Sequence, residues 1–187
     1  MVEMTRFLFF LIDRHDFCCN IKLYSQFEKR TLMDKINVMV AGLPGRMATL
    51  VADAVEKQVD MYLHQFALSD QSGNEGYRMF VPPDEHDRFL RLNRVNIGLV
   101  VDSTTPEVVN RNADMYCLYG VPFVMNTVGG NRVRLTRSVE LSNIPAVIDI
   151  RIVFPDDFLA AIRFLATQIA IPGGRVYTMV DVLRGKA

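Results

Sequence analysis

Residues 36–48 read INVMVAGLPGRMA, and this stretch decides the fold. Its first six residues are an almost continuous apolar run, which is typical of a strand that is buried on both faces. Glycines follow at positions 42 and 45, and residues 46–57 then place apolar side chains three and four positions apart, as an amphipathic helix does. A strand, a glycine turn and a helix in this order are the arrangement with which dinucleotide-binding folds hold a pyrophosphate.

Strands and helices are expected to alternate along the rest of the chain. Apolar runs predict further strands over residues 61–68, 97–102, 122–125, 145–148 and 176–182. Helical spacing predicts helices over residues 106–119, 133–142 and 156–170, whereas residues 69–87 are polar, contain Gly and Pro, and are expected to be mostly loop. This alternation predicts an α/β domain of the Rossmann-like type, a doubly wound parallel sheet with residues 36–41, 97–101 and 122–125 as central strands.

Residues 1–32 differ from the rest of the chain, because they carry no clear start or stop signals and no convincing periodicity. We interpret them as an appended N-terminal segment that precedes a Rossmann-like domain over residues 33–187. The alternative is an extra helix that packs on the domain, which the aromatic content of the segment favours.

Composition excludes several classes of protein. Lys and Arg together number 21 and so do Asp and Glu, so no basic excess points to nucleic-acid binding. Three cysteines, two of them adjacent, make a poor disulfide framework and are expected to be reduced thiols. The apolar run at residues 7–12 is far shorter than the roughly 20 residues that span a bilayer, so neither a membrane segment nor a secretory signal is expected.

The glycine turn is the main candidate site. Glycines let the backbone approach a phosphate, and a helix N-terminus offers unpaired N–H groups and a partial positive charge. Ala48 takes the place of the usual third glycine, where only close packing is demanded. An ordinary tight turn between strand and helix is the structural alternative.

The end of the second strand is expected to meet the adenine ribose. Asp70 is the candidate acid for the ribose hydroxyls, although it equally suits a turn. A second set of residues would instead receive a 2′-phosphate: Ser69, Gln71, Ser72 and Arg78. The sequence does not choose between NAD and NADP.

Other polar groups are given structural roles. His64 and His86 are not at metal-ligand spacing from another His or Cys, so no metal site is expected, and residues 84–88 are interpreted as a solvated turn or helix start. Asp156 and Asp157 suit the N-terminus of the helix after them. Cys117 is expected to be a buried small apolar residue.

Three segments resemble one family, the 4-hydroxy-tetrahydrodipicolinate (dihydrodipicolinate) reductases of the diaminopimelate route to lysine, in their plant-like branch. They are VMVAGLPGRMA at 38–48, VDSTTPEVVNRNADMYCLYGVPFVMNTVGG at 101–130, and RVYTMVDVLRG at 175–185. The first resembles the family's phosphate turn. The second is similar to its Asp-aromatic-Thr-x-Pro element, Gly-Val-Pro strand and Gly-Thr-Thr-Gly loop, and the third to its closing strand.

The resemblance implies an oxidoreductase that binds NADPH or NADH. It implies that Gly45, Arg46 and Met47 face the pyrophosphate, in a cofactor-binding turn that also includes Gly42, Leu43 and Pro44. It places Asn126, Thr127, Val128 and Gly129 on the nicotinamide side. The chain departs from the family pattern at Asn126, where the family has glycine, at Val128, where it has threonine, and at Ser103, which replaces the aromatic residue.

A larger departure concerns the substrate. By the resemblance, a substrate domain with a histidine pair, a lysine and a Gly-Thr would interrupt the Rossmann fold, but here residue 148 passes almost directly to the last helix, near 148–152. The chain has histidines only at 15, 64 and 86, and no lysine between Lys57 and Lys186. No catalytic residue is therefore assigned.

Two functions remain open at this stage. The first is an NAD(P)H-binding reductase domain, incomplete for reduction of a cyclic dicarboxylate, and the alternative is a non-catalytic, reductase-like interaction or assembly protein. The expected partners are a nicotinamide dinucleotide and a small dicarboxylate, and the sequence also allows a homo-oligomer. The expected location is the cytoplasm, or a plastid if the chain comes from a plant.

Overall fold

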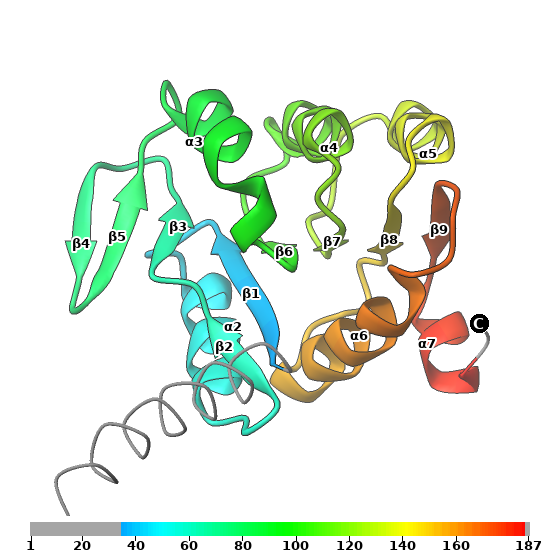
Figure 1. Cartoon of the computed structure of the whole chain (residues 1–187), viewed down its shortest axis with the longest axis horizontal. Helices are drawn as coiled ribbons and strands as arrows, with labels where there is room; N and C mark the ends of the chain where they lie inside the picture. The colour runs from blue at the N-terminus through cyan, green and yellow to red at the C-terminus, as the bar shows by residue number, and fades with distance from the viewer. Residues whose placement is uncertain (1–34, 186–187) are drawn as a thin grey trace, which may run out of the picture. The chain divides into compact units, whose positions relative to one another are not determined.

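A single mixed sheet organises the described part of the protein, residues 35–185 of the computed structural model (Figure 1). The segment predicted over residues 1–32 lies outside the described residues. The strand order is β4-β5-β3-β1-β6-β7-β8-β9, with β2 also paired to β1, and every pair is parallel except β4 with β5. The strands are β1 (Ile36–Ala41), β2 (Met61–Leu63), β3 (Phe66–Leu68), β4 (Gly73–Glu75), β5 (Arg78–Val81), β6 (Leu99–Asp102), β7 (Phe123–Met125), β8 (Pro145–Ile148) and β9 (Arg175–Tyr177).

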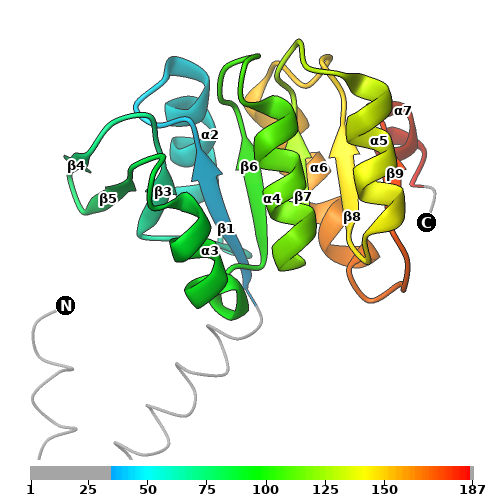
Figure 2. The same ribbon diagram turned by 90° about the horizontal axis from the view of Figure 1, so that it is seen from above.

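Helices cover both faces of this sheet (Figures 1 and 2). One face carries α2 (Arg46–Glu56), α6 (Pro155–Gln168) and α7 (Met179–Arg184). The other carries α3 (His86–Asn93), which continues into a short 3₁₀ turn at Arg94–Asn96, then α4 (Val109–Tyr119) and α5 (Arg132–Leu141). The predicted doubly wound α/β fold and its three central parallel strands are confirmed.

The core has two layers because alternate side chains of each strand point to opposite faces. In β1, Val38 and Val40 pack under α2 and α6, whereas Met39 and Ala41 pack with α4. All four are at most 1% exposed, which explains why this strand is apolar throughout rather than alternating.

Two segments differ from the expectation. Residues 69–87, expected to be mostly loop, also contain β4 and β5, a hairpin whose outer strand is exposed at every residue and therefore lacks an apolar pattern. The last predicted strand, 176–182, ends at Tyr177. There Asp181 accepts hydrogen bonds from the backbone N–H and the hydroxyl of Thr178, and this capping box starts α7.

Smaller differences concern boundaries. The strand predicted over 61–68 is split at His64, whose Nδ1 accepts a hydrogen bond from the Phe66 N–H at 3.1 Å. The helix predicted from residue 106 begins at Val109 and ends, as predicted, at Gly120, which has a φ of +69°. Gly120 supplies the left-handed conformation that commonly ends a helix.

The connection from β8 to α6 is short and well anchored. Asp149 is buried there, and its carboxylate accepts hydrogen bonds from the Arg151 side chain and from the backbone N–H of Met179 at 2.8 Å. Ile152 is fully buried beneath this connection. By contrast Ile150, Val153 and Phe154 are 51%, 46% and 67% exposed, so apolar surface stays open at this end of the sheet.

Candidate functional site

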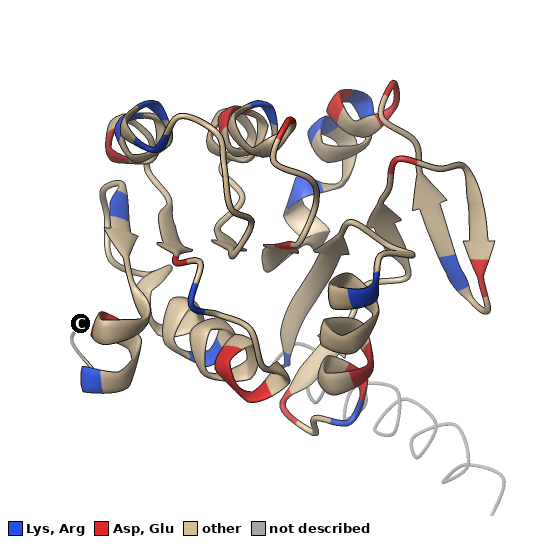
Figure 3. Cartoon of the chain, turned by 180° about the vertical axis from the view of Figure 1, so that it is seen from behind, with Lys and Arg blue, Asp and Glu red and all other residues tan. Residues whose placement is uncertain are grey.

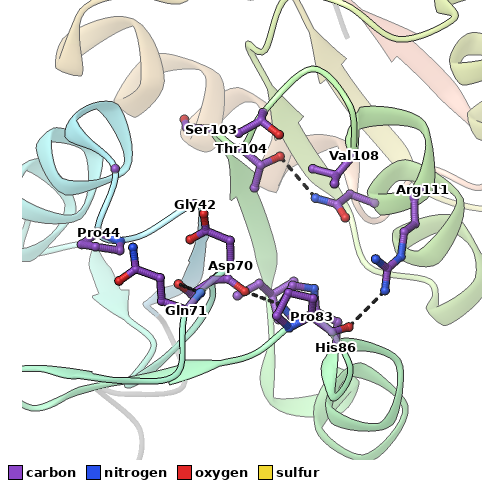
Figure 4. Close-up of a pocket in the computed structure, with 15 residues that line it drawn as sticks. Gly42, Pro44, Asp70, Gln71, Pro83, His86, Ser103, Thr104, Val108 and Arg111 are labelled. Atoms are coloured by element: carbon purple, nitrogen blue, oxygen red, sulfur yellow. Dashed lines mark hydrogen bonds between the residues drawn. The ribbon is translucent and has the colours of Figure 1, made fainter.

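A pocket of about 400 Å³ lies at the carboxyl ends of the central strands (Figure 4). It is lined by the loops after β1, β3 and β6 together with the first turns of α3 and α4. The chain leaves β1 toward β3 on one side and resumes at β6 on the other, so the strand order reverses here. Such a switch point is where doubly wound sheets bind their ligands.

The glycine turn forms one wall of the pocket. Gly42 has a φ of +104°, and a Cβ placed on it would lie 2.6 Å from the Ser103 carbonyl oxygen. The Gly45 N–H donates to the Gly42 carbonyl at 2.8 Å, and a Cβ on Gly45 would lie 2.7 Å from that same oxygen. Both positions therefore demand glycine, because the backbone packs too closely around each of them to admit a side chain.

The helix N-terminus at this turn is free of acidic groups. The first helical bond of α2 runs from the Thr49 N–H to Gly45 O, so the N–H groups of Arg46, Met47 and Ala48 precede the hydrogen-bonded ladder. Gly45 caps the helix without a side chain, and the first turn holds no acidic residue. An anion is the natural partner for such an end.

The helices elsewhere in residues 35–185 show a different pattern. Only α4, which also begins at the pocket, lacks both a side-chain cap and an acidic residue in its first turn, as α2 does. Asn131 caps α5, Asp157 accepts a hydrogen bond from the Phe154 N–H at the start of α6, where the sequence predicted a helix end with two acids, and α3 carries Asp87. The N-terminal ends of α2 and α4, neither of which has a side-chain cap, therefore both border the same pocket.

The turn after β3 forms the second wall. The Ser69 hydroxyl donates to the Leu43 carbonyl and accepts a hydrogen bond from the Gln71 N–H at 3.0 Å. These bonds fix the turn, so that exposed Asp70 and Gln71 line the pocket beside the glycine turn (Figure 4).

His86 lies at the floor of this wall and corrects an expectation. The sequence placed it in a solvated turn or helix start; it does begin α3, but it is only 7% exposed. Its Nε2 lies 2.8 Å from Val81 O and 3.1 Å from Ser69 O, and since both are carbonyl oxygens, Nε2 carries the hydrogen. Burial lowers the pKa of His86. Its two hydrogen bonds tie β5 to the turn after β3.

The third wall depends on a buried carboxylate. Asp102 ends β6 with no exposed surface, and it accepts hydrogen bonds from the Thr104 N–H and hydroxyl at 3.0 and 2.5 Å. Asn112 and Tyr116 of α4 donate to its other oxygen at 2.9 and 2.8 Å. Burial raises the pKa of Tyr116 well above its usual range, so the phenol remains a donor. This cluster fixes Thr104 at the pocket rim.

The predicted nicotinamide residues lie outside the pocket lining. The Asn126 amide donates to Ile152 O at 3.1 Å and accepts from the Ser103 hydroxyl at 3.1 Å, so it joins the loops after β6, β7 and β8. The Thr127 hydroxyl donates to Thr104 O at 3.1 Å. Val128 is 64% exposed, and Gly129 has a φ of +112°.

The pyrophosphate residues fall into two groups. Gly42, Pro44 and Gly45 line the pocket, whereas the Leu43 side chain is fully buried in the core and that of Met47 packs against it. Arg46 is exposed at the start of α2. Leu43 and Met47 therefore present only their backbone to a ligand.

Sequence reasoning assigned no role in the site to several lining residues, namely Pro83, His86, Thr105, Val108, Arg111 and Asn112. For some of these residues helical spacing could have indicated a shared position. Val108, Arg111 and Asn112 are three and four residues apart at the start of α4, and His86 precedes buried Leu90 by four residues in α3.

The remaining candidate residues, His64 and Cys117, do not line the pocket. His64 is half-buried against Phe66 and Phe89, and burial lowers its pKa. Cys117 is partly buried, and burial raises its pKa. Among residues 35–185 no cluster of metal-ligating side chains occurs, and no helix of that part is long and apolar enough to cross a membrane. Acidic and basic residues are interspersed over the helices (Figure 3).

Comparison with known proteins identifies relatives. Two reductases of Arabidopsis thaliana match: 4-hydroxy-tetrahydrodipicolinate reductase 2, chloroplastic, is 37% identical over 60% of this chain and 35% of its own length. 4-hydroxy-tetrahydrodipicolinate reductase 1, chloroplastic, is 34% identical over 79% of this chain and 45% of its own length. The chain thus spans less than half the length of these relatives.

A solved structure shares the fold. The dipicolinate-bound dihydrodipicolinate reductase from Paenisporosarcina sp. TG-14 aligns with a TM-score of 0.51 at 17% identity, over 61% of this chain and 46% of that one. Residues 36–154 match the family described as "Dihydrodipicolinate reductase, N-terminus". This matched region holds every residue that lines the pocket, and the chain belongs to the dihydrodipicolinate reductase family.

Proposed function

We propose that this chain binds a nicotinamide dinucleotide at the pocket and serves as the cofactor domain of a 4-hydroxy-tetrahydrodipicolinate reductase. The observation that carries the proposal is the glycine turn, whose tight backbone and uncompensated helix N-terminus open on a pocket at the switch point of the sheet. The names of the relatives support the choice of reaction.

The residues present suit the adenosine and pyrophosphate parts of such a cofactor. The N–H groups of the first turn of α2 would receive the pyrophosphate, and the turn after β3 would receive the ribose. When bound, the nicotinamide supplies a hydride for reduction of the substrate. Thr104 and Thr127, which are hydrogen-bonded to each other, would set the edge of the nicotinamide side.

The substrate side is proposed to be incomplete within these 187 residues. Ser103 and Asn126 hold the loops there, and neither is a strong acid or base. His64 and His86 are both committed to packing or to backbone contacts. We infer that residues 33–187 form one Rossmann-like domain, and that groups able to grip and protonate a dicarboxylate are missing near residues 148–152, where the chain runs straight into α6.

The alternative is a non-catalytic, reductase-like protein that acts through contacts. One observation favours it, the exposed Ile150, Val153 and Phe154 at the same end of the sheet. A protein that failed to bind any dinucleotide yet formed a defined oligomer would match this alternative rather than the cofactor domain.

Calorimetric titration of the full chain with NADH, NADPH and ADP tests the proposal. Binding with a Kd in the micromolar range is expected for at least one dinucleotide. Arg46→Glu adds an acid to the first turn of α2, which stabilises the helix by about 0.3–1 kcal/mol but repels the pyrophosphate. We expect the melting temperature to hold or rise while the affinity falls at least tenfold.

Arg88→Glu is the matched control, since Arg88 is exposed in the first turn of α3 and lies outside the pocket lining. Its affinity for the dinucleotide should equal that of the wild type. Absence of binding by either dinucleotide at millimolar concentration contradicts the proposed function.

The plant relatives are named as chloroplast proteins, and this supports a plastid rather than the cytoplasm as the location of this chain. Imaging of the chain with a fluorescent protein at its C-terminus in plant cells tests this.

A further inference from the structure

The two halves of the sheet differ in what they offer a dinucleotide. A doubly wound fold binds one nucleotide over each half, on either side of the switch point. The pocket lies over the first half, where the loops after β1 and β3 meet the N-terminus of α2, which no side chain caps. Ser103 and Thr104, which follow β6, lie at its rim on the side away from Asp70 and His86 (Figure 4). Over the second half, the ends of β7 and β8 contribute no residue to the pocket lining.

Asn126 bridges the strand ends of this second half. It follows β7 directly and is half-buried, and its Oδ1 accepts a hydrogen bond at 3.1 Å from the Ser103 hydroxyl, after β6. Its Nδ2 donates at 3.1 Å to the carbonyl of Ile152, after β8. The side-chain amide of Asn126 therefore spans the carboxyl ends of three neighbouring strands.

Other polar groups of the second half are also paired within the protein. The Thr127 hydroxyl donates to Thr104 O at 3.1 Å, and the Arg132 guanidinium donates to Thr127 O. The Asn131 side chain caps α5 by accepting a hydrogen bond from the Arg134 N–H at 3.0 Å. These groups bond to one another, whereas the first turn of α2 leaves its N–H groups to a ligand.

The chemistry of Asn126 matches the part of a dinucleotide that would lie over the second half. Nicotinamide carries a carboxamide, the same group as an asparagine side chain, with a carbonyl acceptor and two N–H donors. A nicotinamide ring in this place would need a donor and an acceptor such as the Ser103 hydroxyl and the Ile152 carbonyl. Both are hydrogen-bonded to Asn126 instead.

We infer that the Asn126 side chain occupies the nicotinamide subsite of this chain, so that the chain holds only the adenosine diphosphate part of a dinucleotide. The inference rests on the proposed function and narrows its ligand class. That class is nucleotides that carry adenosine diphosphate, whether or not a nicotinamide is attached. ADP-ribose is then as good a ligand as NADH.

Calorimetric titration of the full chain compares each dinucleotide with its counterpart that lacks only the nicotinamide. NADH is paired with ADP-ribose, and NADPH with 2′-phospho-ADP-ribose. We expect the two Kd values of a pair to agree within about fivefold, which is what one net hydrogen bond contributes. The emission maximum of the bound reduced nicotinamide should equal that of the free dinucleotide in water, because the ring stays in solvent.

Asn126→Ala frees the Ser103 hydroxyl and the Ile152 carbonyl for the carboxamide of the cofactor. In this variant the dinucleotide should bind more than about fivefold more tightly than its counterpart, and its emission should shift to shorter wavelength as the ring leaves water. Asn93→Ala is the matched control, because the Asn93 amide donates to Phe89 O at 2.9 Å and lies outside the pocket lining. Its Kd values and emission should equal those of the wild type.

A wild-type chain that binds a dinucleotide more than about fivefold more tightly than its counterpart overturns the inference and leaves the proposed function standing. A folded Asn126→Ala variant that keeps the wild-type ratio and emission does the same. The comparison within the wild type decides the matter if this variant does not fold. Failure of both dinucleotides to bind at millimolar concentration overturns the proposed function and the inference with it.

Discussion

Asp102 has no exposed surface and yet is matched by donors on both carboxylate oxygens. A buried charge is tolerated only when it is hydrogen-bonded in this way. The donors come from the loop after β6 and from α4, so the cluster joins the pocket rim to the helix behind it. Each oxygen accepts two of these hydrogen bonds, and because Asp102 is fully buried, water cannot replace a donor that is lost.

Tyr116→Phe tests this cluster, because it removes only the phenol hydroxyl that donates to Asp102. Hydrogen bonds to charged groups contribute roughly 1.5–3 kcal/mol, so we expect that loss in the free energy of unfolding, measured by urea denaturation. Tyr119→Phe is the matched control, since Tyr119 donates to exposed Asp87 at 2.6 Å. This substitution should reduce the free energy of unfolding by less than about 0.5 kcal/mol. Equal losses for the two variants would contradict a special role for burial.

Asp149 links pH to stability. Hydrogen bonds from the Arg151 side chain, and further ones from the backbone N–H groups of Arg151 and Met179, lower the pKa of this buried carboxyl to about 2 from its usual 3.8, against the opposing effect of burial. The unfolded chain therefore takes up the proton first as the pH falls. The stabilisation is complete above about pH 4 and is lost between pH 4 and 2, and it amounts to about 2 kcal/mol.

Asp149→Asn should therefore unfold more readily than the wild type at pH 7, and the gap should close as the pH approaches 2. Urea denaturation across this range measures it. Asp156→Asn, at an exposed position of α6, should show at most a small gap. A gap for Asp149→Asn that stays constant from pH 7 to 2 would show that the lost side chain matters for its shape and not for its charge.

At the scale of elements, β9 docks on the end of α5 through a glycine. A Cβ on Gly174 would lie 1.7 Å from Val139 O and 2.6 Å from Ser142 O, both backbone atoms of α5 and its cap. No rotation of a side chain relieves such an overlap. The strand must move away from α5, and its pairing with β8 must suffer.

Gly174→Ala is therefore expected to reduce the free energy of unfolding by about 3 kcal/mol. Gly173→Ala offers the contrast, because Gly173 has a φ of +101° but open space around it. It should cost only about 1–2 kcal/mol of backbone strain. Urea denaturation compares the two, and a smaller loss for Gly174→Ala than for Gly173→Ala would disprove close docking of β9.

Elements were predictable from the sequence where burial is two-sided. The strands β1, β6, β7 and β8 are largely apolar, so no surface pattern obscures them. The strand β4 is exposed at every residue and pairs on one side only, so its sequence has no reason to differ from a loop. At residues 178–182 the β-branched residues suggest a strand. The hydrogen bonds from Thr178 to the Asp181 carboxylate instead stabilise the start of a helix.

The site was predictable where backbone shape matters and not where distant elements meet. The glycine turn and Asp70 follow from spacing after a strand. The contributions of Pro83, Arg111 and Asn112 depend on how α3 and α4 pack, which no local pattern contains. The bridge made by Asn126 between three loops likewise depends on the sheet order, and the sequence alone showed only a departure from glycine.

At the scale of the molecule, the pocket and the exposed side chains of Ile150, Val153 and Phe154 lie at the same end of the sheet but beside different strands. The loops after β1, β3 and β6 enclose a site suited to a dinucleotide, whereas the loops after β7 and β8 are tied to each other by Asn126 and Ile152. Within residues 35–185 His64 and His86 are the only histidines, and lysines occur only at 35 and 57. Of these residues, only His86 lines the pocket.

We therefore predict that the 187-residue chain alone binds NADPH or NADH but oxidises either at near-background rate with freshly generated cyclic dicarboxylate substrate. A positioned general acid typically contributes roughly 10²–10⁴-fold, and positioning of the substrate contributes more. A second copy of the chain would bring the same side chains and the same deficiency. Steady-state absorbance at the nicotinamide band measures the rate, with a full-length plant reductase as the control for active substrate. Turnover within the usual enzyme range of about 1–10³ per second would show that residues present here, such as Thr104, Thr127 or Arg132, carry the chemistry.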